Sequence, residues 1–167
     1  MPPARVGLVL GVDPGLASTG YGLLAEDNQV VACGTIKTAP GPTAPRLHRI
    51  VSELAALLAA FPIREAALEE LFMGRNTTSA IAVAQARGAI LAALEGAGVP
   101  SFEYKPAQVK AMLTGYGMAG KAQMARMLGA QLAVADGLDD HATDAIAIAL
   151  CHSRSRRFRA AAAVRQP

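Results

Sequence analysis

The chain has 167 residues and a formal net charge of +3, and hydrophobic residues make up 52% of it but aromatic residues only 4%. This length fits one compact domain with a substantial aliphatic core, and no apolar stretch reaches the roughly 18 residues of a membrane span. Neither a secretory signal nor a disulfide or metal-binding cysteine pattern is evident, since Cys33 and Cys151 stand alone, so we expect a cytoplasmic protein.

Basic residues are unevenly distributed along the chain. The segment 104–135 contains four of them and no acid, and the segment 153–167 contains five arginines and no acid. Such clustering indicates a polyanionic partner, with nucleic acid the first candidate. For the arginine-rich end alone, a disordered solubilising tail is the more usual explanation, so we expect one domain over residues 1–153 and a flexible basic tail over 154–167.

Three extended segments open the chain. A strongly apolar run at residues 6–12 predicts a central strand covered on both faces, and it ends at Asp13. A Pro-Gly turn follows, and further strands are expected at 21–25 and 29–37. The short links between these strands predict an antiparallel meander.

Helices and parallel strands are expected next. After a proline-rich link, apolar residues at helical spacing predict a helix over 47–61, which Pro62 ends. The segment 65–71 predicts a strand, and the helical crossover before it would make this strand a parallel neighbour of the first. A long helix at about 77–97 then leads to a fifth strand at 99–104.

The rest of the chain is predicted to be helical, at 106–112, at 121–132 and from Asp139 or Asp140 to Leu150. We therefore expect an α/β fold with a five-stranded mixed sheet, whose first three strands are antiparallel and the others parallel, flanked by helices. The apolar face of the long helix is expected to contain Ile81, Ala84, Gly88, Leu91 and Leu94.

Gly88 is unusual because glycine inside a helix costs about 1 kcal/mol relative to alanine. A close contact with another backbone, within the fold or across a dimer, would explain it.

The segment 115–121 matches most of a phosphate-binding loop, G-x-x-x-x-G-K. Ala122 stands where the Ser or Thr that ligates magnesium is required, and no strand precedes the loop, so we interpret the match as accidental. Lys121 remains a candidate for phosphate contact, as a point charge at the start of a helix.

Three carboxylates stand out by their positions. Asp13 ends the first strand, Glu69 lies in the strand expected beside it, and Asp144 lies among the apolar positions of the last helix. A carboxylate close to a core is costly unless it is paired, protonated or bound to a cation. His141 precedes Asp144 by three residues, on the same helical face.

Less specific explanations are open for each of these residues. Asp13 is also a favoured residue for starting a turn, Asp139 and Asp140 are favoured as helix N-caps, and His141 can be a histidine without a ligand role. Grouped acids, in contrast, suit two divalent ions roughly 3.5–4 Å apart that promote phosphodiester hydrolysis. Oxygen-rich ligation favours Mg²⁺ or Mn²⁺, but the spacing does not show that the three acids meet.

Several motifs together resemble the RuvC family of bacterial Holliday-junction resolvases, which have an RNase H-like fold. They occur in the family's order over about residues 7–152: Gly11-Val12-Asp13-Pro14-Gly15 with Thr19-Gly20-Tyr21-Gly22, Leu68-Glu69-Glu70-Leu71-Phe72-Met73 with Asn76, Gln85-Ala86-Arg87-Gly88, Gln108-Val109-Lys110, and residues 141–149.

The resemblance implies that Asp13, Glu69 and Asp144 are catalytic metal ligands and that His141 is the fourth, where many relatives carry aspartate. It implies that Glu70 is not the catalytic member of its pair. We further expect the Pro14-Gly15 turn and the segment Gly20-Tyr21-Gly22 to give the scissile phosphate room to approach.

DNA contacts are implied for a second set of residues. Phe72 matches the aromatic residue that wedges or stacks at the opened junction centre, although it could instead cap the core. Lys110 and Lys121 match basic residues near the active centre, and Arg75 and Asn76 belong to the exposed turn that follows Glu69.

The activity implied by the resemblance is a homodimeric endonuclease that nicks two strands of like polarity across a four-way DNA junction. It would use two Mg²⁺ or Mn²⁺ ions per active site, leave 5′-phosphate and 3′-hydroxyl ends, and work with the branch-migration proteins RuvA and RuvB. Two alternatives are another RNase H-like nuclease, such as an RNA-processing enzyme, and a catalytically silent junction-binding protein.

Overall fold

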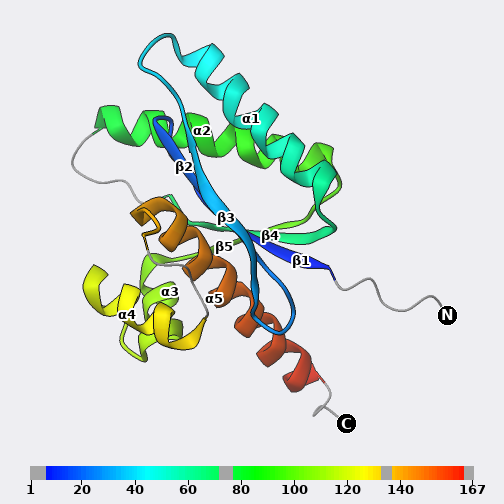
Figure 1. Ribbon diagram of the computed structural model, residues 1–167, viewed down its shortest axis with the longest axis vertical. Coiled ribbons are helices and arrows are strands. Elements are labelled where there is room, and N and C mark those ends of the chain that lie inside the picture. The colour runs from blue at the N-terminus through cyan, green and yellow to red at the C-terminus, as the bar shows by residue number, and fades with distance from the viewer. Residues whose placement is uncertain (1–6, 72–76, 133–136, 164–167) are drawn as a thin grey trace, which may run out of the picture.

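A five-stranded mixed sheet forms the centre of the computed structural model, which describes residues 7–71, 77–132 and 137–163 (Figure 1). The strand order is β3-β2-β1-β4-β5. Strands β1, β2 and β3 pair antiparallel, and β4 is parallel to both β1 and β5, which confirms the predicted sheet. The strands are β1 (Leu8–Asp13), β2 (Ser18–Leu24), β3 (Val30–Lys37), β4 (Ile63–Glu69) and β5 (Ser101–Tyr104).

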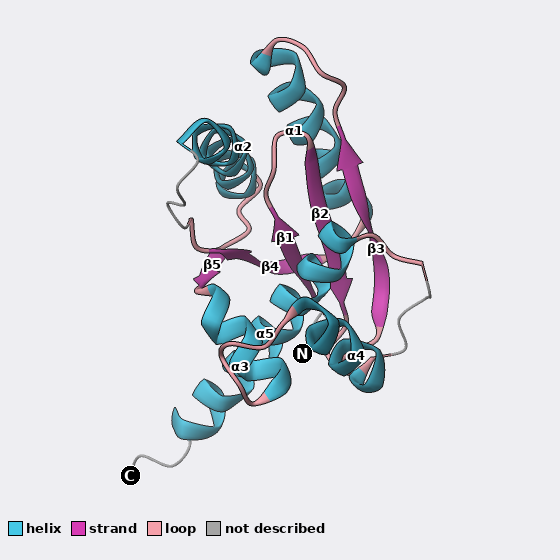
Figure 2. Cartoon of the chain, turned by 90° about the vertical axis from the view of Figure 1, so that its left-hand side faces the viewer, coloured by secondary structure: helices cyan, strands magenta, loops and turns pink. Residues whose placement is uncertain are grey.

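Helices cover both faces of the sheet (Figures 1 and 2). One face packs against α1 (Thr43–Ala60) and α2 (Thr77–Gly96). The other packs against α3 (Pro106–Thr114), α4 (Lys121–Gln131) and α5 (Asp140–Ala163). In the part of the chain that the structure describes, no helix combines the length and apolarity needed to cross a membrane.

Successive side chains of the central strands point to opposite layers. In β1, Leu10 and Val12 belong to the core beneath α1 and α2, whereas Val9 belongs to the core beneath α5. In β4, Leu68 belongs to the core beneath α1 and α2, whereas Ala67 belongs to the core beneath α5. Because side chains alternate along a strand, the last residue of each of these two strands projects toward α5.

Three glycines let α5 lie directly on the sheet. A Cβ added to Gly11 would stand 1.9 Å from the carbonyl oxygen of Ala145, and one added to Gly20 would stand 1.9 Å from that of His141. A Cβ added to Gly22 would stand 2.7 Å from a side-chain carbon of Ile146 and 3.1 Å from its Cα. The expectation that Gly20 and Gly22 make room for a phosphate is therefore wrong, because the backbone of α5 occupies that space.

Helix α1 begins earlier than its apolar pattern indicates, at Thr43 instead of Leu47. Pro45 falls in the first turn, where a backbone N–H has no acceptor within the helix, so proline is tolerated there. The predicted end before Pro62 is confirmed.

The buried face of α2 differs from the predicted one. Ala86, Ile90 and Leu94 are buried, whereas Ile81 and Gly88 are exposed. Nothing lies within 4 Å of a Cβ built on Gly88, so the expected close contact within the fold is absent from the described residues.

The last helix continues to Ala163 instead of ending at Leu150, and residues 154–163 are helical. Two of its arginines have these partners: Arg154 donates to the carbonyl oxygen of Met112 at 3.1 Å, and Arg156 lies 3.5 Å from Glu26. Arginine also has a high helix propensity, so this segment needs no apolar face of its own to stay helical. Residues 154–163 thus continue α5, and the division of the chain into a domain and a flexible tail stays a prediction.

A buried polar cluster ties α5 to the sheet beyond the apolar contacts. His152 is fully buried, with Nδ1 2.8 Å from the hydroxyl of Tyr104 and Nε2 2.9 Å from a carboxylate oxygen of Glu65. The ring of Phe102 lies against it, with ring centroids 4.6 Å apart. The cluster joins β4, β5 and α5, the elements that converge at the site described next.

Cys33 and Cys151 are free thiols, as predicted. Burial raises the pKa of Cys151 to about 11.

Candidate active site

Two acids lie side by side at one edge of the sheet. Asp13 ends β1 and Glu69 ends β4. Val12 pairs with Leu68 in the parallel register, so the next residue of each strand is a carboxylate, and both project to the α5 side. The parallel pairing of the first and fourth strands, as predicted, brings these two residues together.

Helix α5 brings a third acid and a histidine to the same edge. His141 Nδ1 lies 2.8 Å from Asp13 Oδ2, in the first turn of α5. Asp144 follows one turn later, and its pKa is raised by burial and by the charge of Asp13. The close packing of α5 against Gly11 in β1 and Gly20 in β2 fixes the position of this helix on the sheet.

The start of α5 is anchored by Asp139. Its Oδ1 accepts hydrogen bonds from the backbone N–H of Ala142 at 3.0 Å and from the hydroxyl of Thr35 at 2.6 Å. The bond from Thr35, followed by that from Ala142, lowers the pKa of Asp139. This residue therefore caps α5, as one explanation predicted, and also connects the helix to β3.

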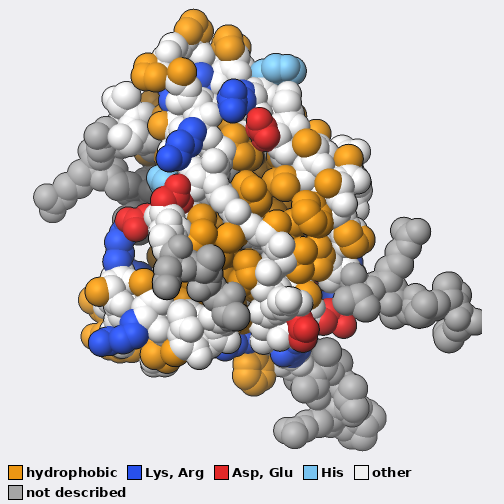
Figure 3. Space-filling view, in the orientation of Figure 1, with side chains coloured by type: hydrophobic (Ala, Val, Ile, Leu, Met, Phe, Trp, Pro, Cys, Tyr) orange, Lys and Arg blue, Asp and Glu red, His pale blue; other side chains and the backbone are white. Residues whose placement is uncertain are grey.

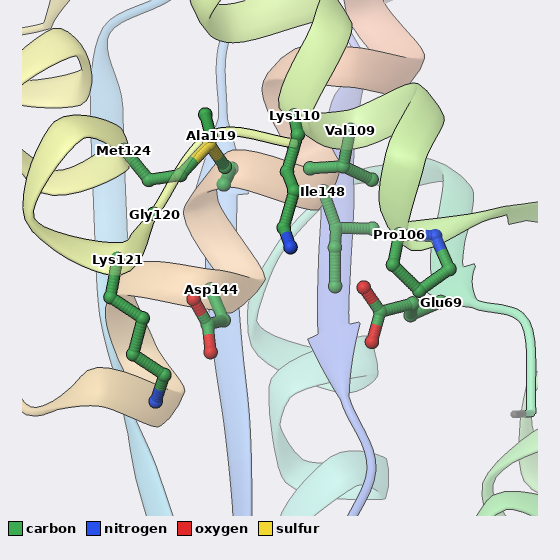
Figure 4. A pocket seen from close by; sticks show the side chains of 11 residues that line it. Glu69, Pro106, Val109, Lys110, Ala119, Gly120, Lys121, Met124, Asp144 and Ile148 are labelled. Carbon is green, nitrogen blue, oxygen red and sulfur yellow. The ribbon is translucent and has the colours of Figure 1, made fainter. Parts of the chain in front are cut away.

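A cavity of about 470 Å³ opens between the sheet edge and the helices α3, α4 and α5. Glu69 and Asp144 point into it from two sides, with Lys110 between them and Lys121 beyond Asp144 (Figure 4). Its apolar lining includes Val109, Met124 and Ile148. Asp13 and His141 are not among the residues that line it, so they lie beside this cavity.

The three carboxylates influence one another electrostatically. Burial, followed by the charges of Asp13 and Asp144, raises the pKa of Glu69 to about 7, and Lys110 offsets this only in part. Burial also raises the pKa of Asp13, against the hydrogen bond and the charge of His141. The site thus holds negative charge that its own cations do not fully compensate.

Lys121 has a carboxylate partner that the sequence did not reveal. Its Nζ lies 3.1 Å from Asp140 Oδ2, and this hydrogen bond raises the pKa of the lysine. Both side chains are exposed at the mouth of the site. The sequence indicates Asp140 as a candidate helix cap close to the face of Asp144, and nothing in the spacing links residues 121 and 140.

The donors of this site suit a hard divalent cation, since they are carboxylates with one imidazole and carry uncompensated charge. They are not drawn together around one point, however. Among the described residues, no three His, Cys, Asp or Glu side chains are grouped closely enough to hold a metal ion. The convergence of four ligands therefore stays a prediction.

Three of the predicted DNA-binding residues, Phe72, Arg75 and Asn76, lie outside the described residues. Lys110 and Lys121 are placed at the cavity as expected, and Lys121 begins α4 with no strand before it, so the match to a phosphate-binding loop is accidental. Glu70 continues the chain beyond β4, and its N–H donates to the carbonyl oxygen of Tyr104.

The surface around the site is mixed in charge. Figure 3 shows acidic side chains beside a histidine at the left edge of the molecule, with basic side chains above and below them. An anionic strand that reaches the acids would thus meet cations on either side.

Replacing Glu69 by Gln is expected to raise the melting temperature of the metal-free protein at about pH 8 and to leave it nearly unchanged near pH 4. The pKa of Glu69 is raised from 4.5 in an unfolded chain to about 7, so ionisation of the folded site costs stability as the pH rises through this window. Thermal unfolding in a chelator across this range measures the difference. If the melting temperatures of Glu69→Gln and the wild type differed by the same amount at every pH, the raised pKa of Glu69 would be contradicted.

The match to known proteins is extensive. The family model described as "Crossover junction endodeoxyribonuclease RuvC" matches residues 9–152. The protein of that name from Anaeromyxobacter dehalogenans strain 2CP-1 is 45% identical over 159 residues, which cover 93% of this chain and 85% of the relative.

Solved structures agree with the sequence match. The structure described as T. thermophilus RuvC in complex with Holliday junction substrate has a TM-score of 0.86 and 34% identity, covering 92% of this chain and 96% of that one. The yeast mitochondrial Holliday junction resolvase Ydc2 shares the fold, with a TM-score of 0.67 at 13% identity, over 93% of this chain and 83% of that one. The chain is thus a member of the RuvC family of crossover junction endodeoxyribonucleases, with an RNase H-like fold.

Proposed function

We propose that this protein resolves Holliday junctions by paired, symmetric nicks, in DNA recombination and repair. The observation that carries the proposal is the gathering of Asp13, Glu69 and Asp144 at one sheet edge, beside Lys110 and Lys121. The junction substrate in the T. thermophilus complex supports the choice of DNA.

The side chains of the site have separable roles in this proposal. Lys110, which reaches between Glu69 and Asp144, binds the scissile phosphate and orients it toward the carboxylates (Figure 4). Lys121 contacts a phosphate at the mouth of the site, where Asp140 holds its ammonium group. Val109 and Ile148, in the apolar wall of the cavity, lower the polarity around Lys110 and thereby strengthen its interaction with the phosphate.

Asp13, Glu69, Asp144 and His141 would hold two Mg²⁺ or Mn²⁺ ions, which supply Lewis-acid activation of the phosphate and lower the pKa of the attacking water. The chain's own groups then determine the geometry. His141 fixes the Asp13 carboxylate through its 2.8 Å contact, and the cap at Asp139 fixes α5. The expected products are 5′-phosphate and 3′-hydroxyl ends.

Exchanging His141 for Asp is expected to shift the metal preference toward Mg²⁺. Imidazole suits Mn²⁺ better than Mg²⁺, which prefers oxygen ligands. The ratio of junction-cleavage rates in Mn²⁺ and in Mg²⁺ should fall by roughly tenfold, in the range of changes seen when metal surroundings are altered. If the ratio does not change, His141 is not a ligand, and its role is limited to the contact with Asp13.

A homodimer would supply two equivalent sites for two symmetric nicks. We propose that the exposed face of α2, around Ile81 and Gly88, forms the interface, because a glycine open to solvent allows another backbone to approach. The family resemblance further supports cooperation with the branch-migration proteins RuvA and RuvB.

Introducing Arg at Gly88 is expected to convert the dimer to a monomer with little loss of monomer stability, because the position is open in the chain itself. Analytical ultracentrifugation measures the oligomeric state and thermal unfolding measures the stability. The control Gly129→Arg, at an open position of α4, should leave the oligomeric state unchanged. A dimer that persists in Gly88→Arg would place the interface elsewhere.

Incubation with synthetic substrates tests the function directly. A four-way junction, a DNA duplex and an RNA–DNA hybrid are each incubated with Mg²⁺ or Mn²⁺, and the products are mapped on denaturing gels. Paired nicks restricted to the junction support the proposal. Cleavage of the hybrid alone would indicate an RNA-processing nuclease, and junction binding without cleavage in either metal would indicate a silent binder.

A further inference from the structure

The loop between α3 and α4 is firmly built. Thr114 Oγ1 accepts the N–H of Tyr116 at 3.1 Å and lies within hydrogen-bond distance of the carbonyl oxygens of Lys110, at 2.8 Å, and Tyr116, at 3.0 Å. The N–H of Ala119 donates to Tyr116 O, which closes a second turn. Gly115 has a φ of 76°, a conformation that favours glycine. These bonds give the backbone of the loop a defined conformation.

The loop exposes two large apolar side chains. Tyr116 is 59% exposed and Met118 is 78% exposed, whereas Ala119, the next residue, is buried. In the described part of the chain, Tyr116 and Phe158 are the two aromatic side chains among the exposed large hydrophobic residues. Tyr116 differs from Phe158 in having a second exposed apolar side chain, Met118, two residues away, and neighbouring exposed apolar side chains are candidates for a contact surface.

The loop adjoins the catalytic cavity. Ala119 and Gly120 form its wall on the side away from Glu69, and Lys110 and Lys121 stand on the helices before and after the loop (Figure 4). Tyr116 and Met118 belong to the same loop as these wall residues, so a nucleic-acid strand bound by the two lysines would pass close to this loop.

Charge favours DNA over a protein as the partner of this loop. The segment 105–135 contains four basic residues and no acid, so it attracts a polyanion. A tyrosine ring offers a face on which a base can stack, and methionine adapts its shape to different partners.

We propose that Tyr116 stacks on a base next to the scissile phosphate, with Met118 packing beside it, and that this contact determines which sequences are cut. The inference rests on the proposed junction cleavage and assigns its sequence preference to this loop. Stacking strength differs among bases, so the contact discriminates between cut sites without reading base edges.

The test compares Tyr116→Ala, Tyr116→Phe and Met118→Ala with the wild type on synthetic junctions that differ only in the two nucleotides at the cut site. Phe158→Ala is the matched control, because Phe158 is an exposed aromatic, at 68%, near the other end of α5. Single-turnover rates give the ratio between the best and worst sequences. Fluorescence of 2-aminopurine beside the cut site, read in an Asp13→Asn background, reports stacking directly.

Tyr116→Ala is expected to reduce the ratio between sequences by about fivefold or more and to abolish the fluorescence change, whereas Tyr116→Phe retains both. Met118→Ala shifts the ratio in the same direction by less, and Phe158→Ala leaves it unchanged. Unaltered rates and ratios in Tyr116→Ala would overturn the proposal and point to a protein partner for the loop. An equal loss in Phe158→Ala would also overturn it.

Failure of the proposed function and failure of the role of this loop give different results. If the wild type cuts no junction, the proposed function is wrong, and the inference falls with it. If the wild type cuts with a sequence preference that Tyr116→Ala preserves, only the role of the loop is wrong. Melting temperatures of all variants check that each one is folded.

Discussion

Replacing Asp13 by Asn is expected to reduce junction cleavage by more than about a hundredfold, while junction binding persists. A loss of about a hundredfold is the upper end of the effect of replacing a residue that only contacts a metal ligand, and a ligand itself should matter more. Asp13 is the acid that contacts His141 and raises the pKa values of both Glu69 and Asp144, so it lies at the centre of the site. Asparagine has nearly the same shape but lacks the charge needed to bind a divalent ion. Lys110 and Lys121 are unaltered, so the cationic surface remains.

Cleavage is measured under single-turnover conditions and binding by electrophoretic mobility in a chelator. The matched control is Asp27→Asn, because Asp27 is exposed in the hairpin between β2 and β3, where it accepts the N–H of Gln29 at 3.0 Å. This control should cleave like the wild type. Loss of binding together with cleavage in a folded Asp13→Asn protein would contradict the assigned role, and so would retained cleavage.

Replacing Gly20 by Ala is expected to destabilise the protein by about 3 kcal/mol or more, because the new methyl group would lie 1.9 Å from the carbonyl oxygen of His141. Backbone atoms cannot move aside as a flexible side chain can, so the start of α5 must shift away from β2. That shift carries His141 away from Asp13. For a chain of this size, the melting temperature should fall by roughly 6–12 °C.

Gly129→Ala is the matched control, since Gly129 is an exposed glycine inside α4 with nothing within 4 Å of an added Cβ. Here alanine should stabilise the protein by about 0.5–1 kcal/mol, because it lowers the entropy lost on folding. Thermal unfolding of both variants at neutral pH measures the contrast. Similar melting temperatures for Gly20→Ala and the wild type would show that α5 does not lie against β2 as described.

The sheet and the positions of the acids could be predicted because they depend on local patterns. The apolar run before Asp13 marks a central strand, and a crossover of this length makes β4 parallel to β1. Once two strands are parallel neighbours, residues at their ends must lie together. Asp144 stands out among the apolar positions of its helix, but its place beside Asp13 and Glu69 required the family resemblance, since nothing in its spacing fixes the position of α5 on the sheet.

Other features could not be predicted because they depend on distant partners. Helix α2 carries small apolar residues on all sides, so periodicity cannot select its buried face, and Ile81 was placed on the wrong one. The role of Gly20 depends on what fills the space beside it, which is the carbonyl of His141. Likewise, Arg156 lies beside Glu26 and Glu65, and ion pairs between residues so far apart in sequence cannot be predicted from the charges around Arg156 in the sequence.

The contact between Gly11 and Ala145 also determines when the site can form during folding. It joins the first strand to the last helix, and contacts so far apart in sequence form slowly because a long loop must close first. The local hairpins of β1, β2 and β3 can form before it. A partly folded chain in which α5 has not yet docked therefore lacks both Asp144 and His141 at the sheet edge. Nuclease activity should be the last property regained on refolding, after the secondary structure seen by circular dichroism.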